Sequence, residues 1–263
     1  MSRLFDSGRW LLVAALACLA VWFLITWETR IAYLDLAAHS HLWTAFAAAT
    51  MAGLSAVIAF RYRQSVLLPL LFVAFIVMAG VLYGQFSPGG IGEYPADLRG
   101  EVNFKALLVH TAMLGSVLLA WQGALSQSVA ATPMLLVLGR ALIGCYFVIN
   151  ALWQWYYFDI RVEHVEATGG NPALIPVAIG LQLLCGALLA SGRWTRVVVW
   201  PLAIVIVSST VMVHGDLSAD APYPVNIQVQ QWFVKSTILA GLLMSLRPRA
   251  ETQFSASAEH VSG

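Results

Sequence analysis

Arg193-Trp-Thr-Arg-Val-Val-Val-Trp-Pro201 joins two long apolar runs, with two arginines at the junction and a proline inside the second run. An earlier stretch, Arg61-Tyr-Arg-Gln-Ser-Val-Leu-Leu-Pro69, has the same arrangement, and its proline also follows its first arginine by eight residues. Short basic turns between apolar runs are typical of the cytoplasmic side of a membrane protein. The two stretches therefore predict two related halves, each with one basic hairpin.

The composition favours a membrane over a water-soluble core. Of the 263 residues, 60% are hydrophobic and 10% are charged, whereas soluble domains contain about 25% charged residues. The net charge of +1 argues against a nucleic-acid partner, which requires a concentrated basic face. The three cysteines lie singly in apolar runs, without a Cys-x-x-Cys pair, so no metal site is predicted.

Eight apolar runs approach the ~20 residues that a helix needs to cross a bilayer. Helices are expected because the backbone must satisfy its own hydrogen bonds within lipid. The expected fold class is an all-α integral membrane protein with eight transmembrane helices. The predicted spans are residues 10–27, 43–60, 65–84, 105–123, 134–156, 172–191, 196–214 and 230–246.

Charged residues predict the orientation, because short cytoplasmic loops are enriched in Lys and Arg. With the N-terminus inside, one face carries Arg3, Arg9, Arg61, Arg63, Arg140, Arg193, Arg196, Arg247 and Arg249. The other face carries Glu28, Asp35, Glu93, Asp97, Glu101, Asp159, Glu163, Glu166, Asp216 and Asp220. Both termini are then cytoplasmic, and the expected location is a bacterial inner membrane. Lys105 and Lys235 are placed at outer helix starts, where a lysine can extend to the interface.

A shift of about 131 residues aligns landmarks of the two halves in order. Gly8-Arg9 meets Gly139-Arg140, Glu28-Thr-Arg30 meets Asp159-Ile-Arg161, and Phe104 and Lys105 meet Phe233 and Lys235. Four spans per half give both halves the same orientation, as in parallel repeats. The predicted units are a first four-helix repeat (1–124), a linker (125–133), a second four-helix repeat (134–249) and a disordered tail (250–263).

The second half resembles the DoxX family of four-helix membrane proteins. The resemblance lies in Gly139-Arg140, Gln182-Leu-Leu-Cys-Gly186, Gly192-Arg193-Trp-Thr-Arg196 and a helix ending Val-His214-Gly. It implies a link to the DoxD subunit of thiosulfate:quinone oxidoreductase and to other membrane redox systems. The family often has a glutamate before the glycine-rich part of its second helix. Here Gln182 occupies that position, and Thr50 occupies it in the first half.

The candidate quinone or proton site consists of His110, Asn150, Gln182 and His214. An ionisable residue at depth in a span usually faces an interior or a cavity, which singles out His110. The amides Asn150 and Gln182 could bind a quinone carbonyl, or they could hold helices together, which is the commoner use of amides in membranes. The arginines Arg9, Arg61, Arg63, Arg140, Arg193 and Arg196 are expected to anchor the chain to lipid and fix its topology.

The resemblance favours a redox-associated membrane subunit that anchors a partner oxidoreductase, with quinone as the candidate cofactor. The alternative is a non-enzymatic structural or assembly subunit of a larger complex. Loops 85–104 and 215–229 are long enough to bind other membrane or extracytoplasmic subunits. No nucleotide, haem-attachment or serine-nucleophile motif is present, so catalytic activity is neither predicted nor excluded. A small-solute transporter is less favoured, because no paired Gly/Pro interruption occurs near the middle of the spans.

Overall fold

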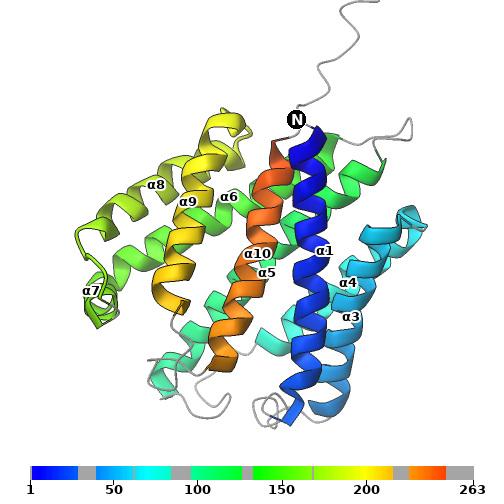
Figure 1. Cartoon of the computed structure of the whole chain (residues 1–263), viewed down its shortest axis with the longest axis horizontal. Coiled ribbons are helices and arrows are strands. Elements are labelled where there is room, and N and C mark those ends of the chain that lie inside the picture. The colour runs from blue at the N-terminus through cyan, green and yellow to red at the C-terminus, as the bar shows by residue number, and fades with distance from the viewer. Residues whose placement is uncertain are drawn as a thin grey trace, which may run out of the picture.

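The computed structural model describes residues 2–28, 40–61, 63–83, 96–125, 133–167, 169–215 and 225–246. All secondary structure in these ranges is helical (Figure 1), which confirms the predicted all-α class. The helices are α1 (Ser2–Ile25), α3 (Ser40–Phe60), α4 (Gln64–Tyr83), α5 (Ala96–Leu125), α6 (Pro133–Tyr156), α7 (Phe158–Ala167), α8 (Leu174–Ala190), α9 (Thr195–His214) and α10 (Val225–Ser245). The predicted linker and tail fall almost entirely outside the described ranges.

Six helices in the described ranges are long and apolar enough to cross a membrane, so the chain is an integral membrane protein. They are Arg3–Ile25, His41–Phe60, Gln64–Val81, Phe104–Leu125, Met134–Tyr156 and Thr195–His214. These correspond to the first five predicted spans and the seventh. The other two predicted spans coincide with α8, which is apolar but has 17 residues, and with α10, which carries several glutamines and a lysine. The count of eight spans stays a prediction.

Three segments expected to be loops are helical over part of their length. Residues 96–104 of loop 85–104 belong to α5, and residues 225–229 of loop 215–229 belong to α10. Both helices begin directly after a proline in the sequence, a residue that precedes a helix more easily than it continues one. The short helix α7 forms because Phe158, Val162 and Val165 recur at helical spacing and pack beneath α8. The other residues of these two loops that lie outside the described ranges are 85–95 and 216–224.

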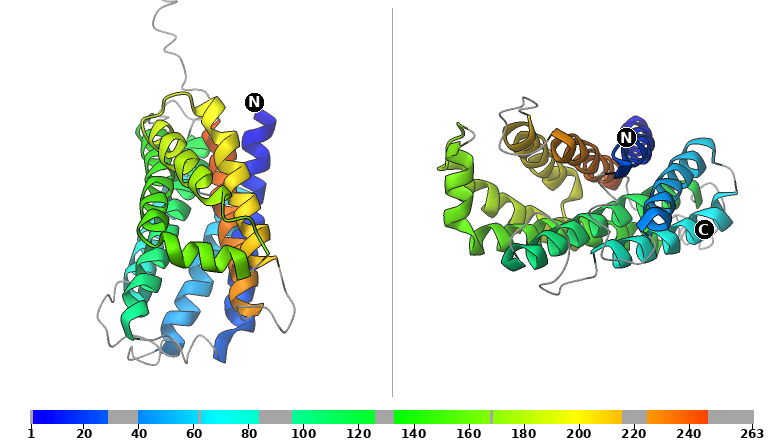
Figure 2. Two further views of the ribbon diagram at one scale, coloured as in Figure 1. Left: turned by 90° about the vertical axis from the view of Figure 1, so that its left-hand side faces the viewer. Right: turned by 90° about the horizontal axis from the view of Figure 1, so that it is seen from below.

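The first helix of each half packs against the last helix of the other half. In the first half, α1 contacts α10 as well as α3, the next helix of its own half. In the second half, α6 contacts α5 as well as α8 of its own half. We call α5 and α10 the exchanged helices, because each packs against the first helix of the other half. They also contact each other. Figure 2 shows this arrangement along and across the helices. One continuous core of buried side chains therefore runs from α1 to α10 through both halves.

Glycines permit the close approach of helices at both exchanged contacts. A Cβ at Gly8 on α1 would lie 2.8 Å from the carbonyl oxygen of Ala240 on α10. A Cβ at Gly139 on α6 would lie 2.9 Å from the carbonyl oxygen of Gly115 on α5. Small residues of this kind let helix backbones meet within a membrane, where packing replaces the hydrophobic effect.

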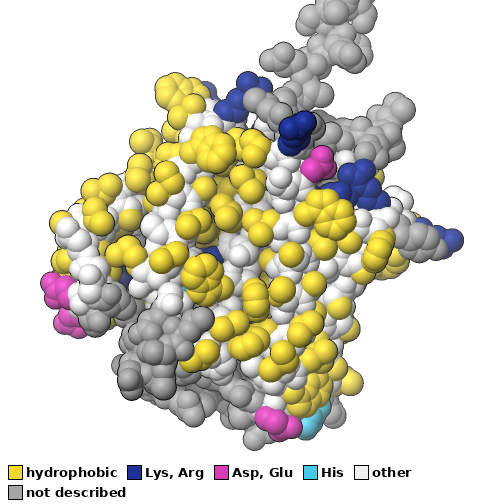
Figure 3. All heavy atoms as spheres, viewed as in Figure 1, with side chains coloured by type: hydrophobic (Ala, Val, Ile, Leu, Met, Phe, Trp, Pro, Cys, Tyr) yellow, Lys and Arg dark blue, Asp and Glu magenta, His cyan; other side chains and the backbone are white. Residues whose placement is uncertain are grey.

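The two basic stretches form turns with the same backbone conformation. Arg61 and Arg63 have φ of 54° and 42°, and Gly192 and Trp194 have φ of 73° and 51°. The carbonyl oxygens of Arg63 and Trp194 each accept hydrogen bonds from the backbone N–H groups three and four positions later. Figure 3 shows that Lys and Arg side chains gather at the end of the molecule where the chain starts. The side of the membrane to which this end belongs stays a prediction.

Candidate functional site

Lys235 is the centre of the candidate site and lies midway along the 21 residues of α10. Its Nζ donates a 2.8 Å hydrogen bond to the hydroxyl of Tyr146, which is buried on α6. The Nζ is 5.5 Å from the centroid of the Tyr146 ring, a distance reached by approaching end-on past the hydroxyl and not over the ring face. The contact is therefore a hydrogen bond, which leaves the other ammonium protons available to a ligand.

The depth of Lys235 corrects the prediction that it lies at an outer helix start. The last span was expected from residue 230, but α10 begins at Val225 and brings the lysine to the middle of the helix. Within the described residues, the one ion pair joins Arg61 and Asp6, so no described carboxylate neutralises Lys235. Lys235 lies beside Tyr146, midway along the candidate span Met134–Tyr156, although α10 is not among the six candidate spans. A lysine at the centre of a membrane span costs about 2.5–3.5 kcal/mol on insertion scales, and such residues usually mark a functional site.

Three polar side chains of α6 line up with Lys235. Tyr146, Asn150 and Gln154 recur every four residues, which places them along one side of the helix. The Asn150 Nδ2 donates to the Oε1 of Gln182 on α8 at 2.7 Å, and the Gln154 Nε2 approaches the same oxygen at 3.4 Å. The Gln182 Nε2 donates to the carbonyl of Ala178 within α8. We call Tyr146, Asn150, Gln154, Gln182 and Lys235 the polar seam.

Aromatic rings lie beside the far end of the polar seam. Trp153 stacks on Phe104 of α5, with centroids 5.1 Å apart and planes inclined by 27°. The Nζ of Lys105 lies 5.5 Å from the Trp153 ring centroid. This end of α6 thus carries stacked aromatic rings and a lysine on its α5 side, next to the amides that reach α8.

Close contact of α6 and α8 holds the amides of the seam together. A Cβ at Gly144 would lie 2.5 Å from the carbonyl oxygen of Gly186, and a Cβ at Gly186 would lie 2.9 Å from the carbonyl oxygen of Gly144. The two backbones therefore touch one to two turns from Asn150 and Gln182. This contact sets the helix separation across which their amides hydrogen-bond.

The structure places the two predicted histidines away from the polar seam. His110 is buried where α5 faces α4, with its ring 5.6 Å from that of Phe75. Its Nδ1 lies 2.7 Å from the carbonyl oxygen of Ala106, which can only accept, so this nitrogen carries the proton. His214 is the last residue of α9, and its carbonyl accepts a 2.7 Å hydrogen bond from the Trp232 indole. Of the four predicted site residues, only Asn150 and Gln182 come together.

Arg140 differs from the lipid-exposed anchor that was expected. The side chain is 5% exposed, and its Nε and Nη2 both donate to the carbonyl oxygen of Ser245, the last residue of α10. A cation is favourable at this end of a helix, where carbonyl groups lack partners within the helix. Arg193 and Arg196, by contrast, are exposed, as an anchor requires.

Replacing Arg140 with methionine should destabilise the protein. The variant loses two charge-assisted donors at the end of α10, so we expect a loss of about 2 kcal/mol in the free energy of unfolding. Denaturant unfolding in detergent, followed by circular dichroism, measures it. Arg193→Met is the matched control, and its exposed side chain should change stability by less than about 0.5 kcal/mol. Equal losses in the two variants would contradict the capping role.

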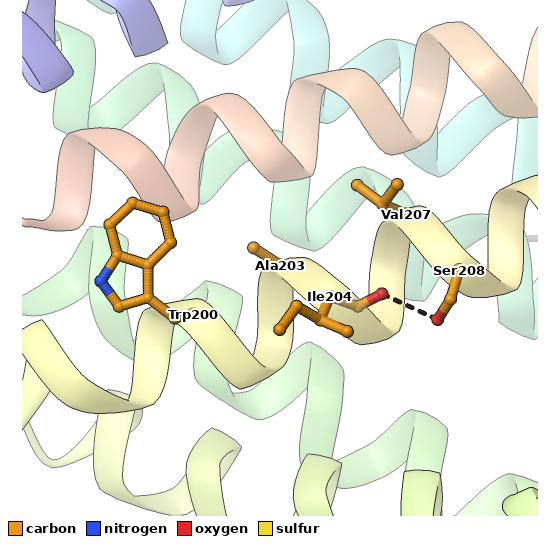
Figure 4. A pocket seen from close by; sticks show the side chains of 5 residues that line it. All are labelled: Trp200, Ala203, Ile204, Val207 and Ser208. Carbon is orange, nitrogen blue, oxygen red and sulfur yellow. Dashed lines mark hydrogen bonds between the residues drawn. The ribbon is translucent and has the colours of Figure 1, made fainter.

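An open groove of about 340 Å³ on α9 is not the candidate site. It is lined by Trp200, Ala203, Ile204, Val207 and Ser208 (Figure 4). The one hydroxyl in this lining donates to the carbonyl of Ile204 in the same helix, at 2.8 Å. Apart from the indole N–H of Trp200, the other lining side chains are apolar, so the groove has the character of a lipid-facing surface.

The part of the chain that contains most of the seam is similar to a known family. Residues 135–215 match the DoxX family model. The match covers less than half of the chain and agrees with the resemblance predicted for the second half. It includes the seam residues of α6 and α8 and ends before Lys235. No curated protein and no solved structure matches the chain.

The site contains residues that were not predicted from the sequence. Tyr146, Gln154 and Lys235 join the two predicted amides. The four-residue spacing of Tyr146, Asn150 and Gln154 was a usable signal, because polar side chains that share one side of an apolar helix indicate a buried polar surface. No sequence signal indicated that α10 brings Lys235 to Tyr146, 89 positions away.

Proposed function

We propose that the polar seam binds the head group of a membrane quinone, and that the DoxX-like protein is a membrane subunit of a quinone-linked redox system. The observation that carries this proposal is Lys235, an ammonium at the middle of α10 with Tyr146 as acceptor and no described carboxylate partner. A quinone presents two carbonyl oxygens, which are acceptors, together with a flat ring and an apolar tail. The seam offers donors in the membrane interior, with aromatic rings beside them.

Each seam residue has a distinct role in this proposal. Lys235 donates to one quinone oxygen and favours negative charge there, while Tyr146 orients the ammonium. Asn150 and Gln154 supply amide donors along the same side of α6. Gln182 fixes the Asn150 amide through its Oε1. When bound, the quinone supplies the electron-carrying chemistry.

We further propose that the two halves are tandem repeats and that only the second carries the site. Support comes from the bounds of the first helix of each half. The start and the end of α6 each lie 131 positions after the start and the end of α1. At this displacement Tyr146, Asn150 and Gln154 correspond to Ala15, Leu19 and Phe23, and Gln182 corresponds to Met51, next to the Thr50 that an offset of 132 aligns with it. Ala15, Leu19, Phe23 and Met51 are all buried and apolar. The first half thus packs the same helices without amides, which weakens the view that the amides serve packing alone.

The remaining parts of the proposal concern placement and partners. The protein resides in a bacterial inner membrane. Its basic end faces the cytoplasm, because Arg is enriched in cytoplasmic loops. Loops 85–104 and 215–229 contact the partner oxidoreductase on the opposite side.

A non-enzymatic structural subunit is the second candidate function. The Asn150–Gln182 hydrogen bond of 2.7 Å favours it, because amides that bond each other across a helix contact can serve assembly alone. The two candidate functions predict different effects of removing the amides: loss of quinone binding for the redox subunit, and loss of assembly for the structural subunit.

A double variant that copies the first half separates these candidates. In Asn150→Leu/Gln182→Met the seam receives the residues that the chain itself uses on α1 and α3. We expect quinone binding to weaken about tenfold, because two donors are lost or misplaced. The free energy of unfolding should fall by only about 1 kcal/mol, since interhelical hydrogen bonds in membranes average ~0.6 kcal/mol. Titration of ubiquinone-2 and of menaquinone-4 into nanodiscs measures binding.

Ser55→Ala is the matched control. Ser55 donates to the carbonyl of Val13 and joins α1 to α3 in the first half, so its loss should leave quinone binding unchanged. Unchanged quinone affinity in the double variant, combined with loss of co-purifying subunits, would favour the structural role. An absence of quinone binding by the unmodified protein would overturn the proposed function.

A further inference from the structure

Arg9 on α1 has an unmet hydrogen-bonding requirement. Its Nε is enclosed by protein, and none of the described residues offers it an acceptor. The residue as a whole is half-buried, so an acceptor from outside can reach the guanidinium. Its Cζ lies 4.9 Å from the ring centroid of Trp10, which is 52% exposed. Tryptophan is enriched at the depth of lipid head groups, which indicates what surrounds Arg9.

A second arginine lies near Arg9, on the turn between α3 and α4. Asp6 lies one turn before Arg9 on α1, and it is also the residue that Arg61 contacts. Arg61 and Asp6 are themselves 3.9 Å apart and both well exposed, which makes their ion pair weak. The cluster thus contains two guanidinium groups and one carboxylate, and it retains a net positive charge. Figure 3 shows this basic end of the molecule beside apolar side chains.

The corresponding place in the second half lacks these properties. Arg140 occupies the position of Arg9, but its guanidinium donates to Ser245 and is buried. The arginines of the second turn, Arg193 and Arg196, are exposed and have no described acidic partner. Among these described arginines, only Arg9, on α1 beside the first basic turn, is half-buried with an Nε that lacks an acceptor.

We propose that Arg9 and Arg61 together bind the phosphate of an anionic membrane lipid. Guanidinium groups match phosphate oxygens in a two-pronged geometry and form charge-assisted hydrogen bonds with them. The phosphate accepts hydrogen bonds from Arg61 and from the exposed part of the Arg9 guanidinium, beyond the enclosed Nε, and Trp10 lies along the apolar part of the same lipid. Asp6 competes with the phosphate for Arg61. This site is independent of the quinone proposal.

Lipid titration of the full-length protein tests the site. Delipidated protein in detergent is titrated with phosphatidylglycerol, with phosphatidylcholine and with inorganic phosphate, and bound lipid is counted by native mass spectrometry. We expect phosphatidylglycerol to bind more tightly than phosphatidylcholine, and inorganic phosphate to neither bind nor compete. The Arg9→Gln/Arg61→Gln variant should bind phosphatidylglycerol about tenfold more weakly, as expected for loss of charge-assisted hydrogen bonds. Arg193→Gln/Arg196→Gln, the matched control from the other turn, should bind it normally.

The Asp6→Asn variant should strengthen phosphatidylglycerol binding, whereas the arginine variant weakens it. Removal of the competing carboxylate should tighten phosphatidylglycerol binding about threefold, an effect that misfolding would not produce. Three results would overturn the proposal: equal weakening in both arginine pairs, no gain in Asp6→Asn, or competition by millimolar inorganic phosphate. The last result would indicate a site for free phosphate. Arg61→Gln alone, at an exposed position, provides the same test if the double variant does not fold.

Discussion

Replacing Lys235 with methionine is expected to weaken quinone binding between about tenfold and a hundredfold, because the ligand loses its charged donor. The same change should leave the unfolding free energy unchanged or raise it by about 1–2 kcal/mol. An ammonium in the middle of α10 carries a desolvation cost that its one hydrogen bond to Tyr146 offsets only in part. Methionine has a similar length and no such cost. Quinone titration in nanodiscs and denaturant unfolding in detergent measure the two effects.

Tyr146→Phe separates binding from stability at the same site. This variant keeps the ammonium but removes its described acceptor, so the protein should lose about 1–3 kcal/mol of stability. Lys235→Met in the Tyr146→Phe background should recover most of that loss. If Lys235→Met alone destabilises the protein and leaves quinone affinity unchanged, Lys235 has a structural role and the proposed site is wrong.

Replacing Gly144 with alanine is expected to destabilise the second half by about 3 kcal/mol, at the upper end of the cost of overpacking. The new Cβ would lie 2.5 Å from backbone atoms of both Gly186 and Ala190, so α6 and α8 must move apart. Because the Asn150–Gln182 hydrogen bond joins the same two helices, quinone binding should weaken as well. Thermal unfolding in detergent and quinone titration measure these effects.

Gly180→Ala is the matched control on α8. A Cβ there meets nothing within 4 Å, and alanine is favoured over glycine in a helix by about 0.5–1 kcal/mol. We expect equal or slightly higher stability. A similar loss at Gly180 and Gly144 would show that the backbone contact of α6 and α8 does not govern stability.

The sequence was most informative about the helices and the turns between them. Long apolar runs predicted the all-α class, and six predicted spans recur among the described helices because span length is fixed by the bilayer. The ends of helices were less accurate, since polar residues at an outer end can continue a helix. That error mattered at α10, where the start at Val225 moved Lys235 from a predicted end to the middle.

Contacts between distant helices could not be predicted from one sequence. Arg140 and Arg9 have the same surroundings in sequence, yet Arg140 meets the end of α10, 105 positions away. Such a contact depends on which helix lies opposite, and a span pattern does not contain that information. The sequence could indicate Asn150 and Gln182 as site residues, because both amides lie deep in predicted spans of the same half. The role of His110 stays a prediction, although its burial agrees with the depth expected.

The exchange of α5 and α10 between the halves has a consequence for how the protein is made. The Trp22 indole on α1 donates to the carbonyl of Asn226 at the start of α10, across 204 positions of the chain. At a synthesis rate of about 5–20 residues per second, α1 waits roughly 10–40 s in the membrane before that partner emerges. During this interval Gly8, which later fits against Ala240, faces lipid or another protein. The nascent chain is thus open to an insertion chaperone or to premature cleavage until its last helix is inserted.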